Sequence, residues 1–77
     1  MDRVGILIVE DEEAQRSLLG GLLRKEGYTV GEAPDGAGAL ALFQKEIFEI
    51  VLLDYRLPDT DGLSLLKQIK EINPGTE

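Results

Sequence analysis

The hydrophobic pattern divides the chain into three short apolar runs and three stretches of helical periodicity. Residues 4–9 and 50–53 are nearly unbroken runs of valine, leucine and isoleucine, which predict strands buried on both faces of a parallel sheet. Residues 28–33 predict another short strand, weakened by Gly31. Apolar residues recur at helical spacing in three further stretches, 12–25, 37–45 and 62–72. The pattern therefore predicts the order βαβαβα.

This order of elements predicts an α/β fold. Strands that are joined through a helix and lie parallel in one sheet are connected by right-handed crossovers. If the sheet has the strand order 2-1-3 of flavodoxin-like folds, the strands at 4–9 and 50–53 lie side by side. Glu10 and Asp11 follow the first of these strands, and Asp54 follows the second. We therefore expect three carboxylates at the carboxyl ends of the strands, where open α/β sheets bind ligands.

Three ionised carboxylates at one edge of a sheet repel each other unless a cation lies among them. Oxygen ligands of this kind suit Mg²⁺, which takes one or two carboxylates together with waters and phosphate oxygens. A carboxylate can also act as a nucleophile and form an aspartyl-phosphate, while a metal neutralises charge on the transferred group. Glu10, Asp11 and Asp54 thus predict a Mg²⁺ site beside a phosphorylatable Asp54.

Composition narrows the class of protein and its partners. A chain of 77 residues forms at most one small domain, which buries only about 60% of its unfolded surface. Fifteen acidic and eight basic residues give a net charge of −7, which argues against direct nucleic-acid binding and favours basic partners or a divalent cation. The lack of cysteine excludes disulfides and thiolate metal sites. The run at 4–9 is too short to span a membrane, so we expect a cytoplasmic domain without membrane contact.

Two motifs carry a resemblance to a known family. The sequence ILIVEDE at residues 6–12, followed by LLDYRLPDTDG at residues 52–62, resembles the receiver domain of bacterial two-component response regulators. The match follows all 77 residues in order, and the paired motifs are specific. The resemblance implies a CheY-like form of the flavodoxin-like fold.

The resemblance also implies a function in a phosphorelay. A sensor histidine kinase would transfer a phosphoryl group from a phosphohistidine to Asp54. Asp11 and Asp54 would ligate Mg²⁺, Glu10 would assist, often through water, and the backbone carbonyl of Arg56 would complete the protein ligands. Glu10 stands where the family often has aspartate. Control of transcription is the commonest role in the family, and the domain would be a phosphoacceptor module and not an enzyme.

The chain departs from the family in length. Receiver domains resemble (βα)5 units, whereas residues 1–77 correspond to about the first three, so the fourth and fifth units have no counterpart. The family's Ser or Thr after the fourth strand and Lys after the fifth are therefore unmatched. We expect a partial receiver domain whose strand at 50–53 lies at an open, uncharged sheet edge, and we expect this edge to drive self-association. One face of the sheet is covered only by the helix at 12–25, so we expect the rest of that face to be bare.

Other interpretations compete with this one. A truncated receiver could self-associate without accepting a phosphoryl group. A Mg²⁺-dependent aspartyl-phosphate phosphatase of the haloacid dehalogenase type needs a second aspartate two positions after the nucleophile, where this chain has Arg56. A calcium-binding EF-hand loop would place Leu57 and Gln68 at its first and twelfth ligand positions, and neither is a carboxylate. The last two are disfavoured.

Several residues receive structural interpretations. Asp35 and Asp61 stand where the N-caps of the helices at 37–45 and 62–72 are expected. Asp59 is expected to be solvated. The leucines of the helix at 12–25 are expected to belong mainly to the core. In the two later helices, the expected inward-facing residues are Leu40, Ala41, Phe43, Leu65, Leu66, Ile69 and Ile72.

Overall fold

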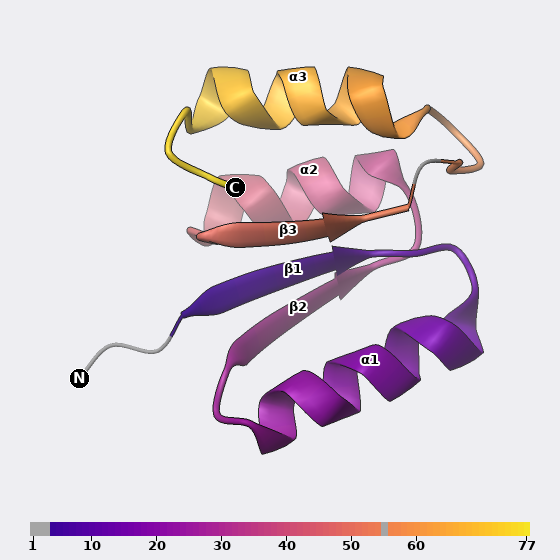
Figure 1. The fold of residues 1–77 in the computed structure, drawn as a ribbon. Helices are drawn as coiled ribbons and strands as arrows, with labels where there is room; N and C mark the ends of the chain where they lie inside the picture. The colour runs from indigo at the N-terminus through magenta and orange to yellow at the C-terminus, as the bar shows by residue number, and fades with distance from the viewer. Residues whose placement is uncertain (1–3, 55) are drawn as a thin grey trace.

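The computed structural model describes residues 4–54 and 56–77, and it has the predicted order of elements. Three strands alternate with three helices (Figure 1). Their bounds are β1 Gly5–Val9, α1 Glu13–Lys25, β2 Thr29–Ala33, α2 Gly36–Lys45, β3 Ile50–Leu53 and α3 Gly62–Ile72. The predicted bounds agree with these to within about one residue.

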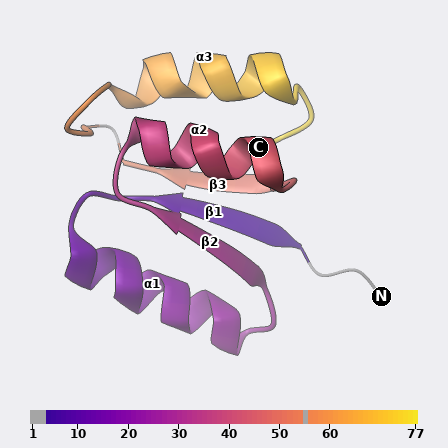
Figure 2. The same ribbon diagram turned by 180° about the vertical axis from the view of Figure 1, so that it is seen from behind.

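The strands form a parallel sheet in the order β2-β1-β3, which confirms the predicted order 2-1-3. Helix α1 covers one face of the sheet, and α2 and α3 lie on the other (Figures 1 and 2). In the central strand, Val9 pairs with Ala33 of β2 and with Leu53 of β3. The three strands therefore end at the same level, and the residues that follow them meet at one edge of the sheet.

The core lies between the sheet and the helices α2 and α3. Its members are the buried residues Leu7, Val9, Ala33, Ala39, Phe43, Phe48, Leu65 and Ile69. Within the expected stripes, Phe43, Leu65 and Ile69 are buried, but Ala41, Leu66 and Ile72 are exposed. Helices α2 and α3 share one face of a sheet of three strands, so each helix buries only part of its apolar stripe.

The leucines of α1 were wrongly assigned to the core. Leu18 is 66% exposed and Leu22 is 54% exposed, and the only buried residue of this helix is Gly20. Within the described residues, α1 is the only helix on its face of the sheet, and it lies chiefly over β1 and β2. Leu52 of β3 is accordingly 37% exposed. The bare apolar face that the sequence predicted is therefore present.

The ends of the helices follow the expected side-chain chemistry. Asp35 accepts a hydrogen bond from the Gly38 N–H at 2.7 Å, and Asp61 accepts one from the Ser64 N–H at 2.7 Å. Both aspartates are therefore N-caps, as predicted. After α1, Gly27 has a φ of 97°, a left-handed conformation that glycine adopts without strain and that ends the helix.

The open edge of β3 is partly occupied by the chain itself. The Glu77 N–H donates to the Glu49 carbonyl at 2.9 Å, and the Val51 N–H donates to the Glu77 carbonyl at 2.7 Å. The Thr76 hydroxyl, which is buried, donates to the Phe48 carbonyl at 2.8 Å. No local pattern in the sequence predicts this contact. The contact leaves only the carboxyl-terminal part of the β3 edge open. None of the helices in the described part of the chain has the length and apolar composition needed to cross a membrane.

Candidate metal and phosphoacceptor site

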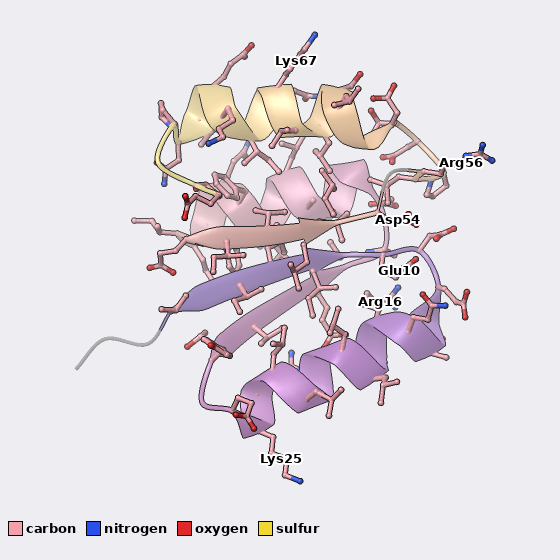
Figure 3. The ribbon with its side chains drawn as sticks, in the orientation of Figure 1. Glu10, Arg16, Lys25, Asp54, Arg56 and Lys67 are labelled. Carbon is pink, nitrogen blue, oxygen red and sulfur yellow. The ribbon has the colours of Figure 1, made fainter. Side chains whose placement is uncertain are left out.

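The three predicted carboxylates converge where β1 and β3 end. The Asp54 N–H donates to the Val9 carbonyl at 3.0 Å, and the Glu10 N–H donates to the Ala33 carbonyl at 3.0 Å. These backbone bonds fix both residues just beyond the sheet, on the same side of the molecule (Figure 3). Carboxylate oxygens of Glu10, Asp11 and Asp54 all lie within 4.8 Å of one another. The geometry is that of a site for one small cation.

Electrostatics at this edge are unfavourable for three negative charges alone. The Glu12 backbone N–H, which donates to Glu10 at 3.1 Å, lowers the pKa of Glu10. Partial removal from water and the neighbouring carboxylates of Asp11 and Asp54 outweigh that bond, so the pKa of Glu10 is raised above its usual 4.5. The two neighbouring carboxylates thus disfavour the ionised form of Glu10.

Basic side chains do not neutralise the cluster. Across residues 4–54 and 56–77 the ion pairs join Glu32 to Arg16 and to Arg24, and neither involves a carboxylate of the cluster. Lys25 and Lys67 point away from it (Figure 3). Hard oxygen donors without a basic partner are the donor set that Mg²⁺ prefers. The residues present thus fit a Mg²⁺ ion.

Arg16 supports the segment that carries two of the acids. Its Nη1 donates to the Glu10 carbonyl at 2.8 Å, and its Nε lies 3.8 Å from a carboxylate oxygen of Glu32 (Figure 3). The other Glu32 oxygen pairs with Arg24 at 2.7 Å. Helix α1 approaches β2 closely here, since a Cβ on Gly20 would lie 2.6 Å from Glu32 Oε2. No local sequence pattern predicts this network, because its members come from α1, β2 and the connection after β1.

The loop after β3 holds its own backbone in place. The Arg56 N–H donates to Asp54 Oδ1 at 3.4 Å, and Arg56 forms an isolated antiparallel bridge with Asp61. The Leu57 N–H donates to the Thr60 carbonyl at 3.2 Å. The guanidinium of Arg56 points away from the acidic cluster (Figure 3), so only its backbone is available to the site.

Asp59 is exposed to solvent, as expected, but its carboxylate also accepts two hydrogen bonds that were not predicted. Its Oδ1 accepts a hydrogen bond from the Gly36 N–H at 2.8 Å, and its Oδ2 accepts one from the Ala37 N–H at 2.9 Å. These two bonds hold the pKa of Asp59 below its usual 3.8, and the bond from the Gly36 N–H contributes most. The bond from the Ser64 N–H likewise lowers the pKa of Asp61. Aspartates therefore join the loop to both α2 and α3.

Comparison with known proteins decides the family. Residues 6–77 match the model of the response regulator receiver domain. The chain belongs to this receiver domain family. Receiver domains are signalling modules of two-component systems, and they bind Mg²⁺ through acidic residues of the kind clustered here.

Two curated bacterial proteins are similar to this chain. It is 40% identical over 73 residues to the transcriptional regulatory protein ZraR of Escherichia coli K12, a match that spans 95% of this chain and 17% of that protein. It is 43% identical over 68 residues to the sporulation initiation phosphotransferase F of Bacillus subtilis 168, spanning 88% of this chain and 55% of that protein. The chain thus covers about half or less of these relatives.

Solved structures confirm the CheY-like fold. A CheY-like receiver domain from Methanospirillum hungatei JF-1 superposes with a TM-score of 0.95 at 34% identity, covering 99% of this chain and 61% of that chain. The response regulator TrrA from Thermotoga maritima, in complex with Mg²⁺-BeF, superposes with a TM-score of 0.84 at 34% identity, covering 92% of this chain and 62% of that chain.

Proposed function

We propose that this receiver domain accepts a phosphoryl group on Asp54 from a sensor histidine kinase in the cytoplasm, and that it thereby controls transcription through the rest of the regulator. The observation that carries the proposal is the convergence of three carboxylates, one of them immediately after β3, that form no ion pair with any residue in 4–54 and 56–77. The names of the relatives support it, since one is a transcriptional regulator and another a phosphotransferase.

Glu10, Asp11, Asp54 and the carbonyl of Arg56 would hold the Mg²⁺ ion. When bound, the ion supplies positive charge that offsets the negative charge of the phosphoryl group. The TrrA complex with Mg²⁺-BeF supports this assignment by similarity of fold and sequence.

In the transfer itself, Asp54 acts as the nucleophile. A carboxylate oxygen of Asp54 forms a bond to phosphorus while the bond from phosphorus to the imidazole nitrogen of the kinase breaks, and that nitrogen keeps the electron pair. The Asp54 N–H, which donates to the Val9 carbonyl, holds the backbone of the nucleophile, and the Arg56 N–H donates to its Oδ1 at 3.4 Å. Both bonds come from backbone that the sheet or the loop has fixed, so little reorganisation is needed before attack.

The direct test is the intact mass of the protein after incubation with acetyl phosphate and Mg²⁺. We expect the addition of one phosphoryl group, mapped by peptide analysis to Asp54, and no addition when Mg²⁺ is removed with EDTA. Addition at another residue, or addition that does not depend on Mg²⁺, would contradict the proposed site.

We also propose that the 77-residue chain self-associates through β3. Beyond the pairing with Glu77, the strand keeps an open edge, and Leu52 beside it is 37% exposed. Light scattering should give a mass above the 8.4 kDa of one chain. Replacing Leu52 by lysine places a charge beside the edge and should restore the monomer. A wild-type chain that is monomeric, with its helices and strands intact by circular dichroism, would refute this.

A further inference from the structure

The loop between β3 and α3 is tied to a helix that precedes it by more than twenty residues. Asp59 spans the first turn of α2 with both carboxylate oxygens, one on the Gly36 N–H at 2.8 Å and one on the Ala37 N–H at 2.9 Å. The amino end of a helix carries partial positive charge, which strengthens such bonds to an anion. Helix α2 is itself anchored in the core by Ala39 and Phe43. Asp59 therefore connects the loop to a rigid part of the fold.

Contact between the loop and α2 is also close at Gly36. A Cβ on this residue would lie 2.6 Å from Thr60 Cγ2 and 3.2 Å from Asp59 Oδ1. Only glycine leaves room for the loop at this distance, and Gly36 is buried by it. The packing and the two hydrogen bonds thus act at the same point.

The same short loop contains the backbone of Arg56. This residue bridges Asp61, which caps α3, while the Leu57 N–H bonds to the Thr60 carbonyl. A backbone carbonyl has no rotamer of its own, so its position depends wholly on how the surrounding loop is held. Metal affinity is sensitive to groups that orient the ligands without touching the ion.

We propose that Asp59 is a positioning residue of the magnesium site, which sets the place of the Arg56 carbonyl by fastening its loop to α2. The inference rests on the function proposed above, because it presumes that the Arg56 carbonyl is a ligand. Asp59 itself has no contact with the acidic cluster and acts through the loop.

A simpler role for Asp59 would be to cap α2 and nothing more. Asp35 offers a matched control, because it caps the same helix through the Gly38 N–H at 2.7 Å but belongs to the connection from β2. Loss of either aspartate removes hydrogen bonds from the first turn of α2 and should lower the melting temperature. Only the loss of Asp59 should release the loop.

The experiment is an NMR titration with MgCl₂ that follows the amide of Glu10, which is unchanged in every variant. We expect Asp59→Ala to weaken Mg²⁺ binding about tenfold and Asp35→Ala to leave the dissociation constant within roughly twofold of the wild type. Equal dissociation constants for the two variants would overturn the inference. A wild type that binds no Mg²⁺ would overturn the proposed function, and the inference with it.

A second pair of variants tests the loop without removing Asp59. Gly36→Ala drives a methyl group against Thr60, whereas Gly21→Ala adds one on α1 where no atom lies within 4 Å. Both changes add alanine to a helix, which favours the helix by itself. We expect Gly36→Ala to weaken Mg²⁺ binding several-fold and Gly21→Ala to leave it unchanged. Unchanged Mg²⁺ affinity in Gly36→Ala would overturn the inference.

Discussion

Replacing Asp54 by asparagine is expected to abolish phosphorylation and, in the absence of Mg²⁺, to make the fold more stable than the wild type. Oxygens of Asp54, Glu10 and Asp11 lie within 4.8 Å of one another, and no basic residue pairs with them in the described part of the chain. Two like charges 4 Å apart repel by about 1 kcal/mol even in water. Asparagine keeps the shape of the side chain, can still accept the Arg56 N–H bond, and removes one charge. We therefore expect a gain of roughly 0.5–1 kcal/mol.

The same substitution should remove the response to Mg²⁺. An ion that binds only the folded state stabilises it by an amount that grows with the logarithm of the ion concentration divided by its dissociation constant, so the wild type should melt at a higher temperature when MgCl₂ is added. Asp54→Asn should melt at nearly the same temperature with and without the ion. Thermal unfolding by circular dichroism, at a fixed protein concentration, measures both effects.

Glu71→Gln is the matched control for Asp54→Asn. It removes one negative charge from an exposed position on α3, away from the cluster, and should shift stability by less than about 0.5 kcal/mol. It should also keep the full response to Mg²⁺. An Asp54→Asn protein that is less stable than the wild type without Mg²⁺ would show that the acidic cluster is not strained by its own charge.

The sequence was sufficient to predict the sheet and the meeting point of the acids. Nearly unbroken apolar runs mark β1 and β3, and Glu10, Asp11 and Asp54 directly follow these strands. Once the strands are parallel and adjacent, the position of these residues depends only on where each strand ends. The acidic cluster could therefore be derived from local patterns once the strand order 2-1-3 of flavodoxin-like folds was assumed.

Contacts between distant segments could not be derived in this way. Asp59 accepts hydrogen bonds from the Gly36 and Ala37 N–H groups only because the loop after β3 folds back over α2, and no local pattern encodes this. Helical periodicity in α1 showed that one face is apolar, but it could not show that Leu18 and Leu22 would reach past the sheet. Helical periodicity identifies a face that can be buried. How much of that face is buried depends on the size of the surface that packs against it.

Phe48 is the most consequential residue that the sequence analysis missed. It belongs to no strand or helix, since it lies in the connection between α2 and β3, yet it is only 1% exposed. Its ring centroid lies 6.2 Å from that of Phe43, and a Cβ on Gly31 would lie 2.8 Å from its Cζ. Gly31, which weakened the prediction of β2, has no side chain, and the ring of Phe48 occupies the space that a side chain would need.

Replacing Phe48 by alanine is expected to destabilise the fold by about 3–5 kcal/mol, because a buried aromatic ring is lost and its cavity cannot close against the rigid sheet. Domains as small as this one have a total stability near the lower end of about 5–15 kcal/mol. The variant should therefore be only marginally stable, or largely unfolded, at 37 °C. Urea denaturation measures the loss. Ile47→Ala, at the neighbouring residue that is 76% exposed, should change stability by less than about 0.5 kcal/mol.

The response of Phe48→Ala to Mg²⁺ separates the core from the site. Phe48 precedes β3 and lies at the amino ends of the strands, whereas Glu10 and Asp54 follow the carboxyl ends of β1 and β3. At a temperature where the variant is still folded, its acidic cluster should be intact. The same concentration of Mg²⁺ should then add the same increment of unfolding free energy to the variant as to the wild type, since at a fixed concentration that increment depends only on affinity for the folded state. A smaller increment in the variant would mean that the position of the carboxylates depends on the core around Phe48, at the amino ends of the strands. It would contradict the expectation that the strand ends and the surrounding loops are sufficient to hold them.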